Sequence, residues 1–145
     1  MRGLIVKQPY ASMIVRGELP VIFLPGRAKG EFVRDLINRK KKIVILSALT
    51  PAEPVDEDKY PLGKAVGSVK VRKVTTSTRN EVLSGKVNEL NENYVKNYPW
   101  NSSKLEREIS IWFLEEPEEW RPPLPYKRMR GAQRWIKNVR LRKGR

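Results

Sequence analysis

The stretch that decides the fold is LIVKQPYASMIVRG, residues 4–17. Its three leading aliphatic residues predict a short buried strand. Residues 8–17 predict a short helix directly after it, because Pro9 suits a first helical position and Gly17 suits the residue that ends a helix. The stretch is therefore predicted to form a strand-to-helix corner.

Outside this corner, the chain alternates between strand patterns and helix patterns. Aliphatic runs or strict alternation predict strands at residues 21–24, 43–46, 64–74, 109–114 and 136–141. Helical spacing predicts further helices at 29–40 and 87–98, and polar or proline-rich stretches predict connections at 50–63, 75–84 and 115–125. We expect an α+β fold, with a mostly antiparallel, partly closed sheet and two or three helices packed beside it.

Positive charge is concentrated at the two ends of the chain. Residues 1–45 contain ten basic and three acidic residues (+7), residues 46–120 contain ten and thirteen (−3), and residues 121–145 contain ten and none (+10), which gives +14 in all. A polyanion suits such a chain because neutralised phosphates release condensed counterions. RNA is therefore the expected partner. The Lys40–Lys42 run is either a solvated helix end beside the negative helix dipole or part of a phosphate-binding face.

Two missing residue types narrow the chemistry. The chain has no cysteine and no histidine, which excludes disulfides, thiolate nucleophiles, sulfur-bound metals and imidazole bases. We expect no cofactor and no metal. No apolar run is long enough to span a bilayer, and the amino-terminal residues lack a signal-peptide cleavage pattern, so we expect a cytoplasmic protein without a membrane partner.

Three separated stretches resemble ASCH domains. They are the strand-to-helix stretch at residues 4–17, GKAVGSV at 63–69, and WFLEEP at 112–117 followed by PPLPYK at 122–127, Gly131 and Trp135. The resemblance implies a small PUA-like β-barrel with helices at its side, here a single domain over residues 1–139 with a basic tail over 140–145. It also implies RNA binding in a cleft beside the barrel. Some members resemble amidohydrolases acting on acetylated cytidine, and nuclease activity has been ascribed to the family.

The chain departs from the family pattern after the first helix. ASCH domains typically carry Gly-x-Lys-x-x-Glu-x-Arg there, and their charged groups line the cleft. Here Gly17 fits, but Leu19, Ile22 and Leu24 take the three charged positions. The lysine–carboxylate acid–base pair is therefore absent from its usual place. This departure favours binding over hydrolysis.

Residue type and family position together select the candidate site. An amide reads base edges, rings stack on unpaired bases, and guanidinium groups bridge phosphates. The expected RNA-binding residues are Lys7, Gln8, Tyr10, Ser12, Ser68, Lys70, Arg72, Tyr126, Lys127, Arg128, Arg130 and Arg134. Single-stranded or looped RNA is the expected form, because its bases are exposed.

Two other classes of function stay open. The first is a metal-independent hydrolase acting on RNA or a modified nucleoside. Its candidate catalytic residues are Lys7, Ser12, Glu18 and Glu31. A carboxylate within about 3 Å of Lys7 or Ser12 inside a pocket would support it. The second is a module that docks on a larger particle through its basic tail.

Overall fold

The computed structural model describes residues 1–26, 31–85, 87, 90, 91, 95, 108–127 and 134–141. In chain order, the elements are β1 (Gly3–Val6), α1 (Tyr10–Val15), β2 (Val21–Pro25), α2 (Glu31–Asn38), β3 (Lys42–Ser47), β4 (Lys64–Thr78), α3 (Arg79–Leu83), β5 (Glu108–Pro125) and β6 (Trp135–Ile136). The α+β class expected from the sequence is confirmed. The strand-to-helix corner is also confirmed, as β1 followed by α1.

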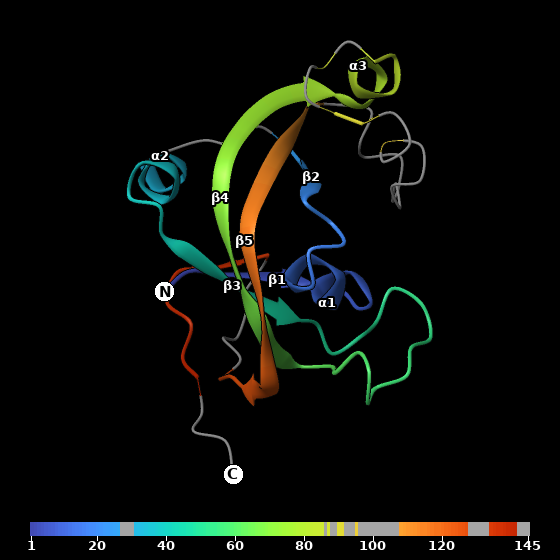
Figure 1. Ribbon diagram of the computed structural model, residues 1–145, viewed down its shortest axis with the longest axis vertical. Coiled ribbons are helices and arrows are strands. Elements are labelled where there is room, and N and C mark those ends of the chain that lie inside the picture. The colour runs from blue at the N-terminus through green and yellow to red at the C-terminus, as the bar shows by residue number, and fades with distance from the viewer. Residues whose placement is uncertain are drawn as a thin grey trace.

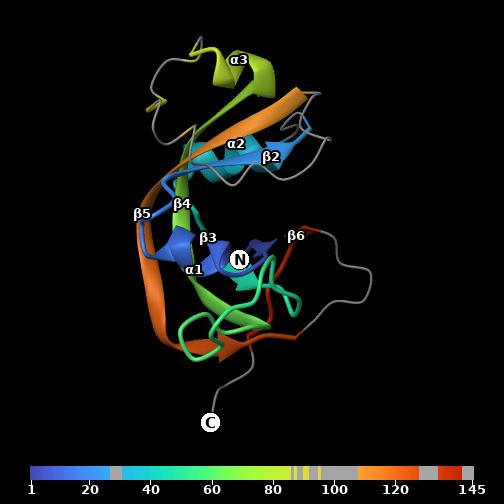
Figure 2. The ribbon, with the colours of Figure 1, turned by 90° about the vertical axis from the view of Figure 1, so that its right-hand side faces the viewer.

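The strands form one curved sheet with the order β2-β5-β4-β3-β1-β6. Neighbouring strands are antiparallel except for β1 and β3, which are parallel. β4 and β5 run together through the length of the molecule and curve around α1 and β3 (Figure 1). Figure 2 shows the same arch from the side, as a half-barrel with α3 at its far end. The pairing of β4 with β5 shifts register at three places, and such bulges increase the bend of a strand pair.

Two predicted connections are wrong. The sequence predicts a polar connection at residues 75–84, but they form the end of β4 and then α3. It predicts that residues 115–125 turn through their prolines, but they continue β5 to Pro125. The reason lies in the pairing: β2 accompanies β5 only as far as Phe113, so the later residues have β4 as their one partner strand among the described residues. Proline is tolerated on such an edge because its missing N–H breaks no ladder.

Two elements predicted in the second half of the chain are not fully matched: one lies mostly outside the described residues and the other is shorter than predicted. Of the predicted helix at 87–98, residues 88, 89, 92–94 and 96–98 lie outside the described residues. The predicted strand at 136–141 is shorter, because β6 covers only Trp135–Ile136 and a single bridge pairs Leu141 with Tyr126. No described helix is long and apolar enough to cross a membrane.

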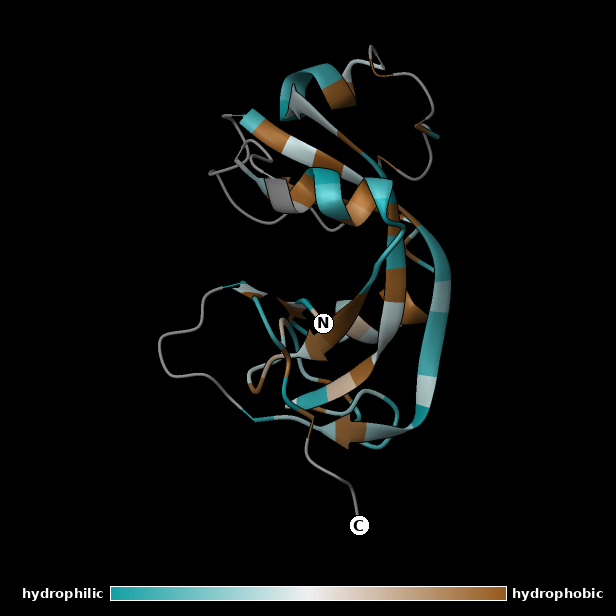
Figure 3. Ribbon diagram, turned by 90° about the vertical axis from the view of Figure 1, so that its left-hand side faces the viewer, coloured by the Kyte–Doolittle hydropathy of each residue, from teal (hydrophilic) through white to brown (hydrophobic). Residues whose placement is uncertain are grey.

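Hydrophobic residues pack on both faces of the sheet. One face carries α1 and α2, with Leu4, Ile43 and Val69 in a core that also contains Trp112. The other face carries a smaller core around Val44 that includes Leu46, Ala65, Tyr126 and Ile136. Figure 3 shows the contrasting part of β5, a hydrophilic stretch that contains four glutamates between residues 115 and 119.

Helix α1 crosses β4 at a position where only glycine fits. A Cβ atom on Gly67 would collide with the carbonyl oxygen of Glu118 and would lie 2.8 Å from a methyl group of Val15. A Cβ carbon does not approach non-bonded atoms this closely, so any side chain here would push α1 away from the strands. Gly67 therefore sets how closely α1 approaches β5.

Candidate functional site

The loop between β3 and β4 is held against α1 by Gln8. The Gln8 side chain is fully buried, and its Nε2 donates to Ser12 Oγ at 2.8 Å and to the Pro61 carbonyl at 2.9 Å. Its Oε1 accepts from the backbone N–H of Ser12 at 3.0 Å, and its carbonyl accepts from the N–H of Ala52 at 2.8 Å. An amide has two N–H donors, and both are used here within the protein. Gln8 therefore positions the loop.

Arg16, directly after α1, joins this loop to β5. Its Nε lies 2.7 Å from Glu119 Oε2, and its Nη2 donates to the Lys59 carbonyl at 2.7 Å. Its guanidinium also lies over the Tyr60 ring, 5.1 Å from the centroid, within the range of a cation–π contact. Arg16 therefore fixes three separate segments around one point.

Glu119 lies between two arginines. Arg121 donates to Glu119 Oε1 from Nε at 3.0 Å and from Nη2 at 2.7 Å, while Arg16 occupies the other oxygen. Burial of Glu119 opposes its ionisation and is the largest single effect, but the hydrogen bonds from Arg16 and Arg121 outweigh it. They hold the pKa of this carboxyl below its usual value. Glu119 is therefore a stable anion that aligns two guanidinium groups.

These residues surround a cavity of about 620 Å³, which we call the Arg16 cavity. It lies between α1, the loop and β5, and its lining residues are Ser12, Arg16, Glu18, Asp58, Lys59, Tyr60, Pro61, Val66, Glu119, Trp120, Arg121 and Pro123. Its size is within the range of small-molecule sites. Its described lining contains three basic and three acidic residues, so these residues offer donors, acceptors and aromatic surface without a surplus of positive charge.

The structure separates the residues predicted near the first helix. Ser12 and Glu18 both line the Arg16 cavity. Lys7 is exposed at the corner before α1. Tyr10 is half-buried, and its burial, followed by the nearby charge of Glu53, raises the pKa of its hydroxyl.

The three residues predicted on β4 do not line this cavity. Ser68 is buried at 3% exposure, although the alternation of β4 predicts it on a solvent face. Lys70 forms an ion pair with Glu116, with 2.6 Å between Nζ and Oε2. Arg72 is exposed and lies over the Phe113 ring, 5.2 Å from its centroid.

The carboxy-terminal candidates are spread out. Tyr126 is buried, and its hydroxyl donates to the Ser47 carbonyl at 3.4 Å, while Lys127 and Arg134 are exposed. Arg128 and Arg130 lie outside the described residues, as does the Glu31 side chain. Contact of these residues with RNA stays a prediction.

Sequence reasoning missed most of the cavity. Tyr60 and Lys59 belong to the stretch predicted only as a connection at 50–63, and Glu119 and Arg121 to the one predicted as a connection at 115–125. Arg16 stands inside the stretch that resembles ASCH domains, which was the one available signal.

The hydrolase alternative required a carboxylate beside Lys7 or Ser12. Within the described part of the chain, neither residue forms a hydrogen bond or ion pair with a carboxylate. The described part of the chain also contains no cluster of acidic side chains that could hold a metal ion.

Solved structures of ASCH proteins from Zymomonas mobilis share this fold. A serine-to-alanine variant of that protein matches with a TM-score of 0.57 at 15% identity, over 98% of this chain and 88% of that one. A tyrosine-to-phenylalanine variant gives 0.52 at 16% identity, over 98% and 90%. A further ASCH structure gives 0.52 at 17%, over 98% and 87%. No protein-family model and no curated protein matches the sequence. The chain therefore shares the fold of these ASCH structures, as its three resembling stretches predict.

Proposed function

We propose that the protein is an ASCH-type RNA-binding module, which holds single-stranded RNA with one unstacked nucleotide in the Arg16 cavity. The observation that carries this proposal is the cavity at the junction of α1, the loop and β5, where two aligned guanidinium groups meet two aromatic residues. The resemblance to ASCH domains and the net charge of +14 support RNA as the ligand.

The donors and acceptors of the cavity suit a nucleobase. A guanidinium has five N–H donors, so Arg16 and Arg121 keep further donors beyond those given to Glu119. Ser12 Oγ accepts from Gln8, and its own proton has no acceptor among the described residues. Arg16 can pair with a base edge while Tyr60 and Trp120 offer faces for stacking.

Single-stranded RNA fits this site better than duplex RNA. A base in an RNA helix is stacked on both faces and paired along its edge, and neither surface can enter a cavity. An unpaired nucleotide can leave the stack at low cost, because no pairing has to be broken. We therefore expect the cavity to select unpaired positions.

The electrostatics of Glu119 suit a structural role better than acid–base catalysis. A general base works best when its pKa lies near the operating pH. The pKa of Glu119 is lowered instead, and both of its oxygens are occupied by arginines. Glu119 therefore acts as a structural anion that keeps Arg16 and Arg121 in place.

The test is to mix the purified protein with labelled single-stranded, duplex and tRNA-like RNAs across a salt series. Each sample is run on a native and on a denaturing gel. Shifted but intact single-stranded RNA, with a preference that survives at high salt, is the expected result. Binding that fades equally for all three RNAs would contradict the proposal, because it would need only a cationic surface. Cleaved RNA would make the protein a nuclease.

A further inference from the structure

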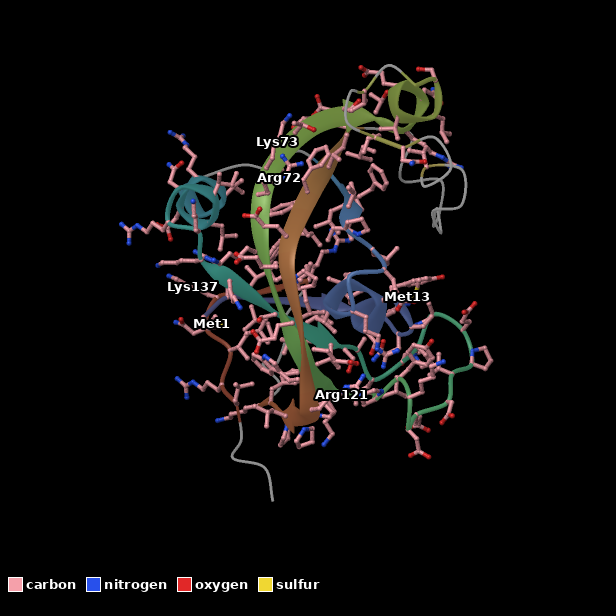
Figure 4. The ribbon with its side chains drawn as sticks, viewed as in Figure 1. Met1, Met13, Arg72, Lys73, Arg121 and Lys137 are labelled. Atoms are coloured by element: carbon pink, nitrogen blue, oxygen red, sulfur yellow. The ribbon has the colours of Figure 1, made fainter. Side chains whose placement is uncertain are left out.

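A second hollow lies between the amino terminus, the end of α2, the start of β3 and the residues after β6. It has a volume of about 450 Å³, and its described lining residues are Met1, Arg2, Asp35, Leu36, Lys41, Lys42, Lys137 and Asn138. We call it the basic groove. Figure 4 shows Lys137 and Met1 close together on the left of the view, whereas Arg121, which lines the Arg16 cavity, lies near the lower end of β5.

The charge of the groove differs from that of the cavity. Four basic residues line it, and Asp35 is the one acidic residue among its described lining residues. The described lining of the Arg16 cavity is balanced, so those residues supply no surplus charge for a polyanion. The basic groove supplies such a surplus within the described part of the chain.

Two lysines that follow the end of α2, Lys41 and Lys42, line the groove. The helix closes with the N–H of Lys41 bonded to the Leu36 carbonyl at 3.2 Å, and Lys40 adopts a left-handed conformation with a φ of 49°. This is the geometry of a helix end at which the chain reverses sharply. The reversal carries Lys41 and Lys42 directly into β3, beside Arg2 and Lys137.

The ion pairs already present in the groove are weak ones. Lys41 Nζ lies 3.4 Å from Asp35 Oδ2, and Lys42 Nζ lies 3.0 Å from Glu118 Oε2. The Lys41 side chain is 53% exposed and that of Glu118 is 56% exposed. Exposed pairs of this kind contribute about 0–1 kcal/mol each, so a phosphate can replace the carboxylate at little cost.

We propose that the basic groove binds the phosphodiester backbone of the RNA whose unstacked nucleotide occupies the Arg16 cavity. This inference rests on the proposed function. Lysines act as mobile point charges, which suits backbone phosphates and carries little base selectivity. The described lining offers no aromatic side chain for stacking, so the groove adds affinity and the cavity adds preference.

Fluorescence anisotropy with two labelled probes tests the groove separately from the cavity. One probe is a short single-stranded RNA, and the other is an oligomer of abasic tetrahydrofuran sites joined by phosphodiesters. Lys137→Gln should weaken binding of both probes and reduce the salt slope by about 0.7, because one phosphate is no longer neutralised. Asp35→Asn should strengthen binding of both probes, because it removes the carboxylate that competes with phosphate.

Matched controls separate the groove from the overall charge. Lys73→Gln makes the same charge change on the distant part of β4, where Figure 4 shows Lys73, and should have a much smaller effect. Glu57→Gln, in the exposed loop, is the control for Asp35→Asn. If Lys137→Gln and Lys73→Gln weaken binding equally, the proposal that the basic groove binds the RNA backbone is overturned. If polyglutamate binds as tightly as the abasic oligomer, in a manner dependent on Lys137, an acidic protein is the better partner and the RNA assignment is overturned.

The two proposals fail in different ways. Tyr60→Ala should weaken RNA binding and leave binding of the abasic oligomer unchanged. If Tyr60→Ala has no effect on RNA while Lys137→Gln weakens both probes, the cavity assignment fails and the groove stands. If RNA binding depends on Tyr60 and not on Lys137, the groove fails and the cavity stands.

Discussion

Glu118 and Glu119, adjacent residues of β5, hold cations on opposite faces of the sheet. Glu118 Oε2 lies 3.0 Å from Lys42 Nζ, and Glu119 Oε2 lies 2.7 Å from Arg16 Nε. Successive side chains of a strand point to opposite faces, so one dipeptide pairs with a lining residue of each hollow, Lys42 in the basic groove and Arg16 in the Arg16 cavity. The neutral cavity suits a base and the basic groove suits phosphates, and β5 connects them.

Glu119→Gln should lower the free energy of unfolding by about 1–3 kcal/mol at neutral pH, because two arginines lose a charged acceptor. The pKa of Glu119 is lower in the folded protein than its ordinary value of 4.5. Its stabilising effect is therefore complete above that value and is lost as the pH falls through the folded pKa. Urea unfolding of both proteins across this range should show their difference shrink below pH 4.5.

The control is Glu57→Gln, in the exposed loop, which should change stability by less than about 0.5 kcal/mol at every pH. A difference between wild type and Glu119→Gln that stays constant down to strongly acidic pH would show that the Glu119 charge does not act through the two arginines.

Gln8→Ala should destabilise the protein by about 2–4 kcal/mol. It leaves the Ser12 N–H and the Pro61 carbonyl without their bonds to the buried amide, and it opens a cavity. Chemical denaturation measures the loss, and limited proteolysis should find earlier cleavage in residues 48–63. Lys7→Ala changes the exposed neighbour and should stay within about 0.5 kcal/mol of wild type. Equal effects of the two substitutions would argue against the structural role of Gln8.

Lys40→Gly should stabilise the fold relative to Lys40→Ala by up to about 1 kcal/mol. Both substitutions remove the same charge, but only glycine relieves the cost of a side chain at the φ of 49°. Urea unfolding of the two variants gives the difference directly. If the alanine variant is the more stable one, the left-handed end of α2 is not the conformation of the protein in solution.

Short-range sequence patterns correctly predicted the elements that depend on residues close together in the sequence. The aliphatic run and Pro9–Gly17 stretch correctly indicate β1 and α1, and the spacing of Phe32, Val33 and Leu36 indicates α2. The prolines of residues 115–125 misled the prediction because turn-forming residues are also compatible with an edge strand. Whether a proline lies on an edge depends on a strand that is distant in the sequence.

The cavity depends on contacts between distant residues. Arg16 and Glu119 are separated by 103 positions, and no periodicity links them. Gln8 shows a second limit of prediction from sequence. The amide donors and acceptor that suit a base edge also suit a buried hydrogen-bond network within the protein. The residue type was informative, but only the packing of the loop decided which role the amide takes in this structure.

The dissociation constant for a short single-stranded RNA, compared between wild type and Arg121→Ala, tests the central claim most directly. The Arg121 side chain is 82% exposed, so its removal should leave stability nearly unchanged. We expect about tenfold weaker binding of the RNA, no change for the abasic oligomer, and a much smaller effect of Lys73→Gln. Equal affinities of wild type and Arg121→Ala for the RNA would contradict nucleotide binding in the Arg16 cavity.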